Sequence, residues 1–316
     1  MPDLKLGYAI NQWDPARREQ QERTFKVMSA CGFRAVELTA GSGRWAPLGN
    51  PHQIVDVNFG SAARFLEFMR SCGVDRVASW FYDPGRPSIE EDSRGRSPSH
   101  AEDHDGIVES LRPFARLLHD LGGSCLVVRP MASYWQEDPV TDDKVKRAAD
   151  CWNKVGTMAA EFGIQVALHP DFLCAIHSAE DIARILELTD PQSVGLAIDT
   201  AELTIAGNDP IVLFEAHAGR VLHFHFKDTH DQDTLGEYKE KGAESRLLGG
   251  GGQRRIARWF WEMGAPGGLV DFPKLVRAIQ TRKFGGWIVV ESDQCVDPAE
   301  SAMLNAYYVR NVLVKG

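Results

Sequence analysis

Polar side chains occur near the ends of short apolar runs along this chain, where a buried strand would normally carry apolar residues. They are Glu37, Arg129, His169, Asp171, Asp199, His223, His225, Lys227, Asp228, Glu291 and Asp293. Imidazole and carboxylate groups together are ligands for divalent ions such as Mn²⁺, Co²⁺, Mg²⁺ or Zn²⁺. The six cysteines are scattered without a Cys-x-x-Cys pair, which disfavours a thiolate zinc site. We therefore expect one divalent metal ion bound by histidines and carboxylates.

His223 and His225 are two positions apart, and side chains with that spacing in a strand point to the same face. Only His225 is expected to reach the end of its strand. A single histidine or aspartate at a strand end most often caps a helix or satisfies a buried hydrogen bond. Several such residues on successive strands are harder to explain in that way, and they favour a shared site.

Short β-rich runs alternate with longer stretches at helical spacing, a pattern typical of βα units that build a parallel sheet. The predicted strands are 4–11, 35–39, 76–82, 124–130, 164–171, 194–200, 221–228 and 286–293. The predicted helices are 20–31, 62–72, 105–121, 143–162, 179–188, 210–217, 272–281 and 298–313. Gly32, Gly73 and Gly163 follow three of these helices and suit the left-handed conformation that ends a helix.

The 316 residues form one domain in this interpretation, because no linker interrupts the repeat and α/β barrels often reach this size. Eight βα units with right-handed crossovers predict an α/β fold, a single (β/α)₈ TIM barrel over residues 1–316. An open doubly wound sheet is the alternative. In a barrel the C-terminal ends of the strands surround the axis at one mouth. The polar residues would therefore converge although they are far apart in the sequence.

Two long segments interrupt the repeat, 84–104 after the third strand and 229–268 after the seventh. Loops of this length are uncommon unless they are functional or disordered, and loops that follow strands lie on the catalytic face of a barrel. Both are candidate lids, with a solvated surface insertion as the alternative. Trp259, Phe260 and Trp261 in the second segment are expected to exclude water from a bound substrate or to form a subunit interface.

Five segments of the sequence resemble the sugar phosphate isomerase/epimerase superfamily of xylose isomerase-like barrels. They are GFRAVEL at 32–38, GLAIDTAELTIAGNDP at 195–210, RVLHFHFKDT at 220–229, GGLVDFPKL at 267–275 and GWIVVESDQ at 286–294. The last two together are most similar to the inosose dehydratase branch. The resemblance covers the C-terminal half best and implies a TIM barrel enzyme that holds a metal ion at its mouth.

The resemblance also implies that the metal ligands come from the fifth to eighth strands. Asp199, His225 and Glu291 match the family's ligand positions, and Mn²⁺ is the expected ion. The fifth-strand ligand of the family is usually glutamate, whereas His169 occupies the matching position here. Epimerases of the superfamily use two metal-bound glutamates as acid and base, and this chain retains only Glu291. That difference favours isomerisation or dehydration, in which one base removes a proton next to a carbonyl.

Further residues are predicted to contact the substrate, and they are Glu37, Arg129, Asp171, Glu202, Asp228 and Trp259. Glu202 stands where the family commonly has histidine, so it either replaces that substrate contact or is an acidic residue at the start of a helix. Glu291 is predicted to be the general base, with His169 and Lys227 as the other catalytic residues. Lys227 would place a positive charge near the carbonyl oxygen or form a structural ion pair.

The predicted function is a metal-dependent isomerase or dehydratase that acts on a keto-sugar or keto-inositol by removing a proton next to its carbonyl. Three alternatives are a sugar 3-epimerase of the same superfamily, a non-catalytic sugar-binding barrel, and a DNA-repair enzyme similar to endonuclease IV. The net charge of −9 disfavours the last, because it repels a phosphate backbone. No phosphate loop, dinucleotide fingerprint, zincin helix or serine nucleophile elbow is present in the sequence.

Composition indicates a protein of the cytoplasm. Hydrophobic residues make up 43% and charged residues 25% of the chain, which suits a buried core. No N-terminal signal sequence and no apolar segment of membrane-spanning length is evident, and the scattered cysteines suit a reducing compartment. We expect a small-molecule sugar or cyclitol as the ligand and no nucleic acid or membrane partner. A homo-oligomer is compatible with the sequence.

Overall fold

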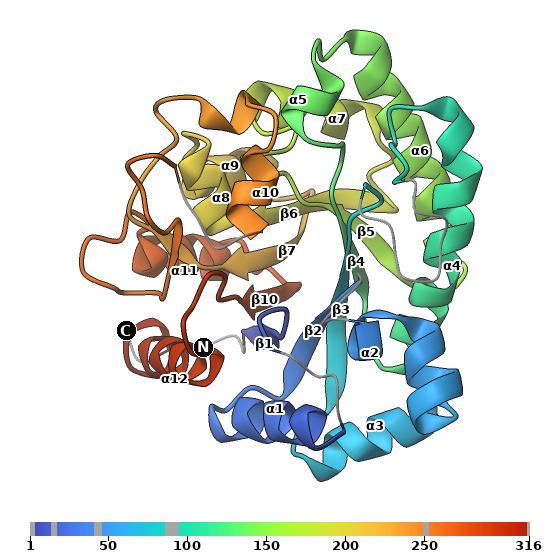
Figure 1. Ribbon diagram of the computed structural model, residues 1–316, viewed down its shortest axis with the longest axis vertical. Helices are drawn as coiled ribbons and strands as arrows, with labels where there is room; N and C mark the ends of the chain where they lie inside the picture. The colour runs from blue at the N-terminus through green and yellow to red at the C-terminus, as the bar shows by residue number, and fades with distance from the viewer. Residues whose placement is uncertain (1–3, 14–17, 41–45, 86–94, 249–252, 315–316) are drawn as a thin grey trace.

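The core of the molecule is a closed barrel of eight parallel strands, in the order β1-β10-β7-β6-β5-β4-β3-β2 (Figure 1). The computed structural model describes residues 4–13, 18–40, 46–85, 95–248 and 253–314. The barrel strands are β1 (Lys5–Ala9), β2 (Ala35–Thr39), β3 (Arg76–Tyr82), β4 (Cys125–Val128), β5 (Gln165–Leu168), β6 (Val194–Asp199), β7 (Val221–Phe226) and β10 (Trp287–Val290). This topology confirms the predicted (β/α)₈ barrel.

Closure of the barrel joins the first strand to the last. β1 pairs with β10 in parallel, with Lys5 opposite Trp287. β10 pairs in turn with β7, where Val289 lies opposite His225. Because all eight strands run in the same direction, the residues that follow each of them are brought to one mouth of the barrel.

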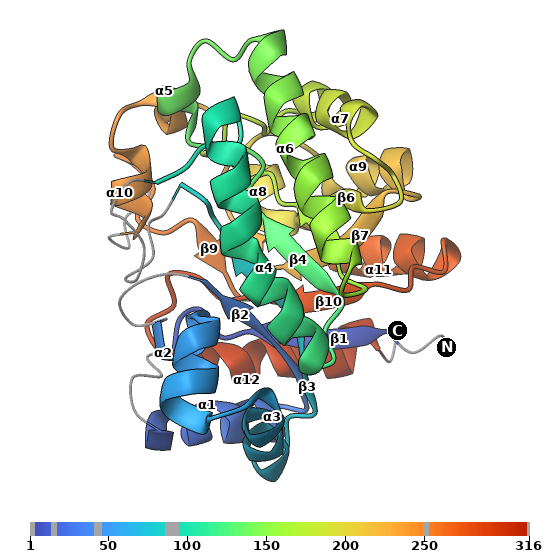
Figure 2. The ribbon, with the colours of Figure 1, turned by 90° about the vertical axis from the view of Figure 1, so that its right-hand side faces the viewer.

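The longer helices surround the barrel (Figures 1 and 2). They are α1 (Arg18–Ala30), α3 (Ala62–Ser71), α4 (His104–Asp120), α6 (Asp142–Ala160), α7 (Ala179–Leu188), α9 (Pro210–His217), α11 (Phe272–Thr281) and α12 (Pro298–Tyr308). In α4, Ile107, Leu111, Phe114 and Leu118 recur at helical spacing, and all four are buried. The apolar face whose periodicity predicted the helix is therefore the face that packs against the sheet. None of the helices in the described ranges is both long and apolar enough to cross a membrane.

Shorter elements of the described residues include α2 (Ala46–Gly49), α5 (Tyr134–Glu137), α8 (Thr200–Ile205), the 3-10 helix Ala101–Asp103, and the π-helical stretches Gln53–Phe59 and Val309–Leu313. The predicted helix 298–313 thus consists of α12 followed by one of these π-helical stretches. Gly32, Gly73 and Gly163 have φ angles of 90°, 91° and 68°, which confirms that they end their helices in the left-handed conformation.

Small side chains fill the inside of the barrel beneath its mouth. The buried cluster there consists of Cys125, Val127, Ala167 and Ala197, with Phe81 and Leu222 packed against it. Layers of this kind make the inside of a TIM barrel a packed core and not a pore. The ring of Phe81 also contacts that of His169, with the two ring centres 5.3 Å apart. This layer therefore lies directly beneath the polar residues at the mouth of the barrel.

The segment 229–268 contains secondary structure that the sequence did not predict. β7 ends earlier than expected, and a short strand β8 (Asp228–Thr229) pairs antiparallel with β9 (Phe260–Trp261). A 3-10 turn (Glu237–Lys239) and the helix α10 (Ala243–Leu248) lie between them. The β8–β9 pair returns the segment to the barrel mouth, and Figure 2 shows α10 and β9 on the same side of the barrel.

The other candidate lid, 84–104, is described only in part, because residues 86–94 lie outside the described ranges. In its described part, Ser97 and Ser99 are buried and donate hydrogen bonds to Glu137 of α5. None of the described residues of this segment lines the cavity at the barrel mouth. Its predicted role as a lid remains a prediction.

Candidate metal and substrate site

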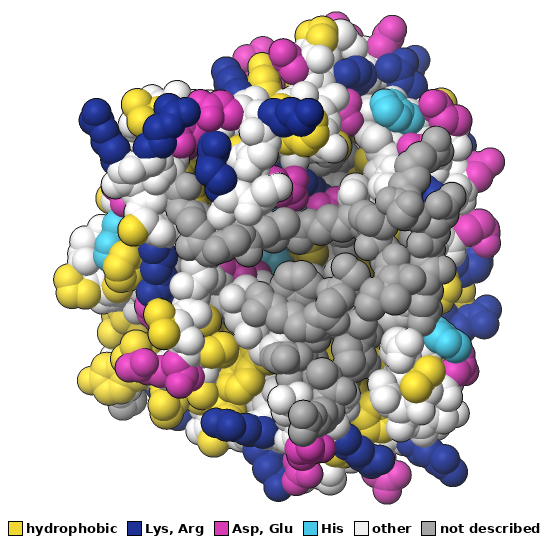
Figure 3. All heavy atoms as spheres, in the orientation of Figure 1, with side chains coloured by type: hydrophobic (Ala, Val, Ile, Leu, Met, Phe, Trp, Pro, Cys, Tyr) yellow, Lys and Arg dark blue, Asp and Glu magenta, His cyan; other side chains and the backbone are white. Residues whose placement is uncertain are grey.

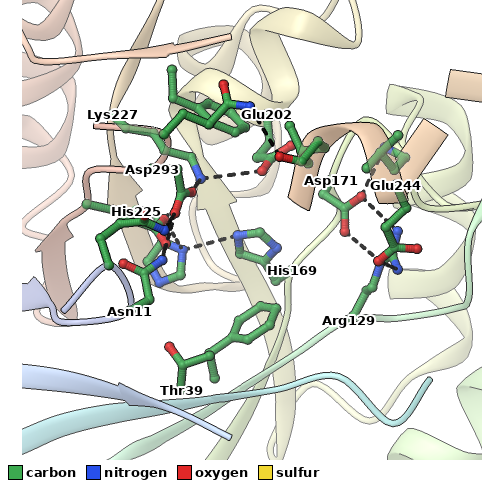
Figure 4. Close-up of a pocket in the computed structure, with 17 residues that line it drawn as sticks. Asn11, Thr39, Arg129, His169, Asp171, Glu202, His225, Lys227, Glu244 and Asp293 are labelled. Atoms are coloured by element: carbon green, nitrogen blue, oxygen red, sulfur yellow. Dashed lines mark hydrogen bonds and ion pairs between the residues drawn. The ribbon is translucent and has the colours of Figure 1, made fainter. Parts of the chain in front are cut away.

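A cavity of about 170 Å³ lies at the mouth of the barrel. Its lining combines residues that follow the barrel strands with three residues of segment 229–268, namely Glu244, Leu247 and Phe260. Acidic side chains are visible in the hollow at the middle of this face (Figure 3), and Figure 4 shows the polar groups that point toward one another inside it. The long segment after β7 therefore forms part of the wall of the cavity.

Three side chains predicted as metal ligands, His169, Asp199 and His225, bring one ligand atom each within 4.8 Å of one another, and the fourth, Glu291, approaches His225. His169 Nε2 lies 3.1 Å from His225 Nδ1 and 3.4 Å from Asp199 Oδ2. His225 Nδ1 lies 3.6 Å from Asp199 Oδ2 and 3.3 Å from Glu291 Oε2. Ligands about 2.1 Å from one ion are separated by about 3.4 Å in a tetrahedron and about 3.0 Å between octahedral neighbours. The buried His169, Asp199 and His225 therefore fit a divalent metal ion, with Glu291 next to His225.

The ends of the strands place these groups. His169 and Glu291 each come one residue after a strand, and their backbone amides still donate to the neighbouring strand, to Val128 O at 2.8 Å and Phe226 O at 3.1 Å. Asp199 ends β6 and also caps α8, because its Oδ1 accepts from the amide of Glu202 at 2.9 Å. That bond leaves Asp199 Oδ2 directed toward the histidines.

Glu37 lies beneath the ligands and does not line the cavity, which corrects its prediction as a substrate contact. Its Oε1 is 2.8 Å from His225 Nε2, its Oε2 is 3.2 Å from His223 Nε2, and Ser79 Oγ donates to it at 2.6 Å. Burial opposes ionisation, but the two histidines hold the pKa of Glu37 well below its usual range. A carboxylate at Nε2 favours the proton on that nitrogen, so Nδ1 of His225 keeps its lone pair for a metal ion.

His223 and His225 confirm the strand periodicity, since both rings face Glu37 and only His225 lines the cavity. Glu37, His223 and His225 form a second buried group whose ligand atoms lie within 4.8 Å of one another. His225 belongs to both groups. The second group is enclosed in the barrel, whereas the group that contains His169 borders the cavity.

Lys227 holds four carboxylates together at the centre of the site. Its Nζ lies 3.2 Å from Asp199 Oδ2, 3.3 Å from Glu202 Oε1, 3.1 Å from Glu291 Oε2 and 2.6 Å from Asp293 Oδ2. Burial opposes its charge, but these carboxylates raise the pKa of Lys227 well above its ordinary value. Burial and the nearby Asp293 raise the pKa of Glu291 to about 7. Lys227 thus lies next to the same oxygens that would face a metal ion.

Glu202 combines the two roles that the sequence left open. It lies in the first turn of α8, and its carboxylate also lines the cavity beside Lys227. Burial raises the pKa of Glu202 well above its ordinary value. A carboxyl group in this position can carry a proton into the cavity.

Arg129 and Asp171 line the cavity opposite Lys227 and are paired with each other. Arg129 Nε donates to Asp171 Oδ2 at 2.7 Å and Nη2 donates to Oδ1 at 3.1 Å. Arg129 Nη1 reaches Asp83 at 3.4 Å and Glu244 at 3.1 Å. Although burial disfavours its charge, these carboxylates hold the pKa of Arg129 well above its usual value.

Two predicted substrate contacts lie away from the cavity. Trp259 immediately precedes β9, is 2% exposed and packs on Phe172, with ring centres 5.3 Å apart. Asp228 lies in β8 and accepts hydrogen bonds from the amides of Thr229 and Val270, at 2.8 and 3.2 Å. Both residues therefore anchor the segment after β7 and do not line the cavity.

Phe260 is the aromatic residue of the segment that lines the cavity, and its ring centre is 4.2 Å from Lys227 Nζ. Trp261 stacks on His230 outside the cavity, with ring centres 4.1 Å apart. One of the three aromatic residues thus has the predicted position for excluding water. The other two stabilise the fold of the segment.

Sequence reasoning did not select several cavity residues. Asn11 Nδ2 donates to Glu291 Oε1 at 2.6 Å and to Asp293 Oδ1 at 2.8 Å, so it orients both carboxylates. Asn11 ends the first predicted strand, and that position, which did identify Asp293 at the end of the last one, was the signal that could have identified it. Glu244 carries no such signal, because it lies inside the long segment after β7.

Proteins of similar sequence include several inosose dehydratases. Curated relatives include an inosose dehydratase of Lacticaseibacillus casei, 31% identical over 195 residues, with 58% of this chain and 61% of the relative covered. An inosose dehydratase of Geobacillus thermodenitrificans (strain NG80-2) is 27% identical over 217 residues, with 64% and 70% covered. The match thus spans less than two thirds of the length of the first relative.

Solved structures resemble this chain over nearly its whole length. A probable 3-DHS dehydratase from Bacillus anthracis has a TM-score of 0.72 at 11% identity and covers 98% of this chain and 100% of its own. A D-allulose 3-epimerase from Methylomonas sp. in complex with D-allulose has a TM-score of 0.70 at 15% identity, covering 98% and 97%. At these identities the likeness shows a shared fold. Residues 25–306 match the family described as xylose isomerase-like TIM barrel, and the chain therefore belongs to that family.

Proposed function

We propose that this chain is a divalent-metal-dependent dehydratase or isomerase that acts on a keto-sugar or keto-inositol. The observation that carries the proposal is the grouping of His169, Asp199 and His225 at the edge of the cavity, with Glu291 Oε2 3.3 Å from His225 Nδ1. The names of the curated relatives favour dehydration of a keto-inositol among these reactions.

The ligand set of two imidazoles and two carboxylates suits Mn²⁺, and also Co²⁺, Mg²⁺ or Zn²⁺. When bound, such an ion polarises a carbonyl and stabilises negative charge on its oxygen. Lys227 adds a second positive charge at the same side of the cavity, within 3.3 Å of four carboxylates. A substrate carbonyl would thus be held where negative charge on its oxygen is stabilised.

Glu291 is the proposed base for the proton next to the carbonyl. Asn11 fixes its carboxylate through a hydrogen bond to Oε1, and the group borders the cavity. Dehydration also needs an acid for the departing hydroxyl, and Glu202 lines the cavity with a carboxyl group whose pKa burial raises well above its ordinary value. Of the two proposed ligands that follow β5 and β10, only Glu291 is a carboxylate, because His169 occupies the other position. A single carboxylate base favours dehydration or isomerisation over epimerisation, which uses two.

Phe260 and Leu247 would shield this chemistry from water, because both belong to the segment that forms the outer wall of the cavity. The six cysteines are free thiols, which suits the reducing environment of the cytoplasm. We accordingly propose a cytoplasmic enzyme with a small polyol substrate.

The test incubates chelator-treated protein with 2-keto-myo-inositol in D₂O, with and without Mn²⁺. Proton NMR then measures deuterium uptake next to the carbonyl, and mass spectrometry measures loss of one water. We expect both only with the metal ion, and neither with Asp199→Asn. Asp231→Asn removes an exposed carboxylate from the segment after β7 and should behave as wild type. Absence of exchange and of product with a panel of neutral keto-sugars and all four ions would contradict the proposal.

A further inference from the structure

Among the described residues, Arg129 is the only arginine that lines the cavity, and three carboxylates contact it. Asp171 occupies Nε and Nη2 as a bidentate pair, and Asp83 and Glu244 both reach Nη1. The guanidinium is 4% exposed. In the part of the chain that the structure describes, one positive charge therefore faces three carboxylates.

Glu244 differs from the other two carboxylates in its origin and its exposure. Asp83 and Asp171 follow β3 and β5, whereas Glu244 belongs to α10 of the segment after β7. The side chain of Glu244 is 19% exposed, against 4% for Asp83 and 12% for Asp171. Ser133 Oγ donates a hydrogen bond to Glu244 Oε2, so the carboxylate is held from a second side. Glu244 is therefore the most exposed of the three carboxylates that contact Arg129.

Arginine recognises phosphate and carboxylate groups through its paired N–H donors. A cavity that contained Arg129 alone would select an anionic sugar derivative. In this cavity an anionic group would have to displace Glu244 from Nη1 and would approach Asp171 as well. Like charges placed side by side in a partly buried site repel strongly, which selects against the wrong ligand.

We propose that Glu244 determines the charge of the substrate, because it covers Arg129 and so excludes phosphorylated and carboxylated polyols in favour of uncharged ones. This inference rests on the proposed function only for the keto-polyol skeleton of the ligand. The covering of Arg129 depends on the observed contacts alone. Substitution of Glu244 should therefore change which charge the cavity accepts.

The experiment compares two ligands of similar size, neutral 2-keto-myo-inositol and anionic 2-keto-D-gluconate. Titration calorimetry at constant ionic strength measures both affinities for Mn²⁺-loaded wild type and for Glu244→Gln. Glutamine keeps the size and the acceptor oxygen of Glu244 while it removes the charge. We expect the ratio of anionic to neutral affinity to rise by about tenfold or more, as removal of one like charge in a partly buried site allows.

Two control variants separate charge from disturbance of the segment. Asp231→Asn removes one charge from an exposed position of the same segment and should leave the ratio unchanged. Ser133→Ala removes a hydrogen bond to Glu244 without a change of charge, and it should leave the ratio close to that of wild type. Thermal unfolding verifies that each variant is folded. If Glu244→Gln unfolds, Glu244→Ala and Glu244→Ser are measured in its place.

An unchanged ratio in folded Glu244→Gln would overturn the inference, and so would an equal rise in Asp231→Asn. Failure of 2-keto-myo-inositol to bind wild type would count against the proposed function instead. In that case the affinity for 2-keto-D-gluconate alone still decides the inference, because Glu244→Gln must bind it more tightly than wild type and Asp231→Asn do. If none of the three binds the anion, the inference is also overturned.

Discussion

Glu37→Gln perturbs the proposed metal site without a change in any residue that lines the cavity. Glutamine has nearly the same shape, so the contact with Ser79 Oγ can persist. The substitution removes the buried negative charge that lies 2.8 Å from His225 Nε2. His225 would then lose the partner that holds the proton on Nε2 and turns Nδ1 toward the other ligands.

The expected loss of metal affinity follows from the contact between Glu37 and His225. Loss of a carboxylate behind a metal-bound histidine costs about 10- to 100-fold in metal affinity, or about 1.4 to 2.8 kcal/mol. Glu37 is 1% exposed, so water cannot take the place of the lost carboxylate oxygen. We expect Glu37→Gln to fall within that range.

The assay is a competition titration of Mn²⁺ against a metal-sensitive chelator, at one pH and with protein shown to be folded. Ser79→Ala is the matched control, since it removes a hydrogen bond to the same carboxylate but leaves the contact with His225. Its loss of affinity should be smaller than that of Glu37→Gln. An unchanged affinity in folded Glu37→Gln would refute the role of Glu37 behind His225. If Glu37→Gln lost all Mn²⁺ binding while His169→Ala bound the ion as wild type does, the ion would instead lie between Glu37, His223 and His225.

Three further predictions concern the base, the pH dependence and the segment after β7. Metal-saturated Glu291→Gln should lose about 10² to 10⁴ in the rate of deuterium exchange, and a wild-type rate would exclude Glu291 as the base. Burial and Asp293 raise the pKa of Glu291 to about 7, so below that pH a metal ion must displace a proton. Mn²⁺ affinity should fall as the pH is lowered through 7. An affinity that does not change between pH 8 and pH 6 would argue against this. Trp259→Ala removes a side chain packed on Phe172 and should lower the free energy of unfolding by about 3 to 5 kcal/mol, measured by urea denaturation. A loss below about 1 kcal/mol would show that this ring does not anchor the segment.

The barrel could be predicted from the sequence because its signals are local. Runs of apolar residues gave all eight strands, and glycines at three helix ends marked the joints between units. The convergence of Asp199 with His225 follows from the same topology, since both lie at the ends of parallel neighbouring strands. A residue at a strand end can thus be placed without knowledge of its contacts.

The remainder of the site depends on contacts that no local pattern encodes. Glu37 was expected to meet the substrate, but the inward face of β2 places it against His223 and His225 below the cavity. Trp259 and Phe260 are adjacent in the sequence, but of the two only Phe260, which pairs with Thr229 of β8, lines the cavity. The position of a side chain on a long segment depends on how that segment folds back onto the barrel.

Anomalous scattering from a crystal of the protein grown with Mn²⁺ tests the central claim most directly. We predict one strong peak at the barrel mouth, about 2.0 to 2.3 Å from His169 Nε2, Asp199 Oδ2, His225 Nδ1 and Glu291 Oε2. In such a crystal Lys227 Nζ should lie farther from the carboxylate oxygens that face the ion. A peak between Glu37 and His223, or no peak at either position under saturating Mn²⁺, would contradict the claim.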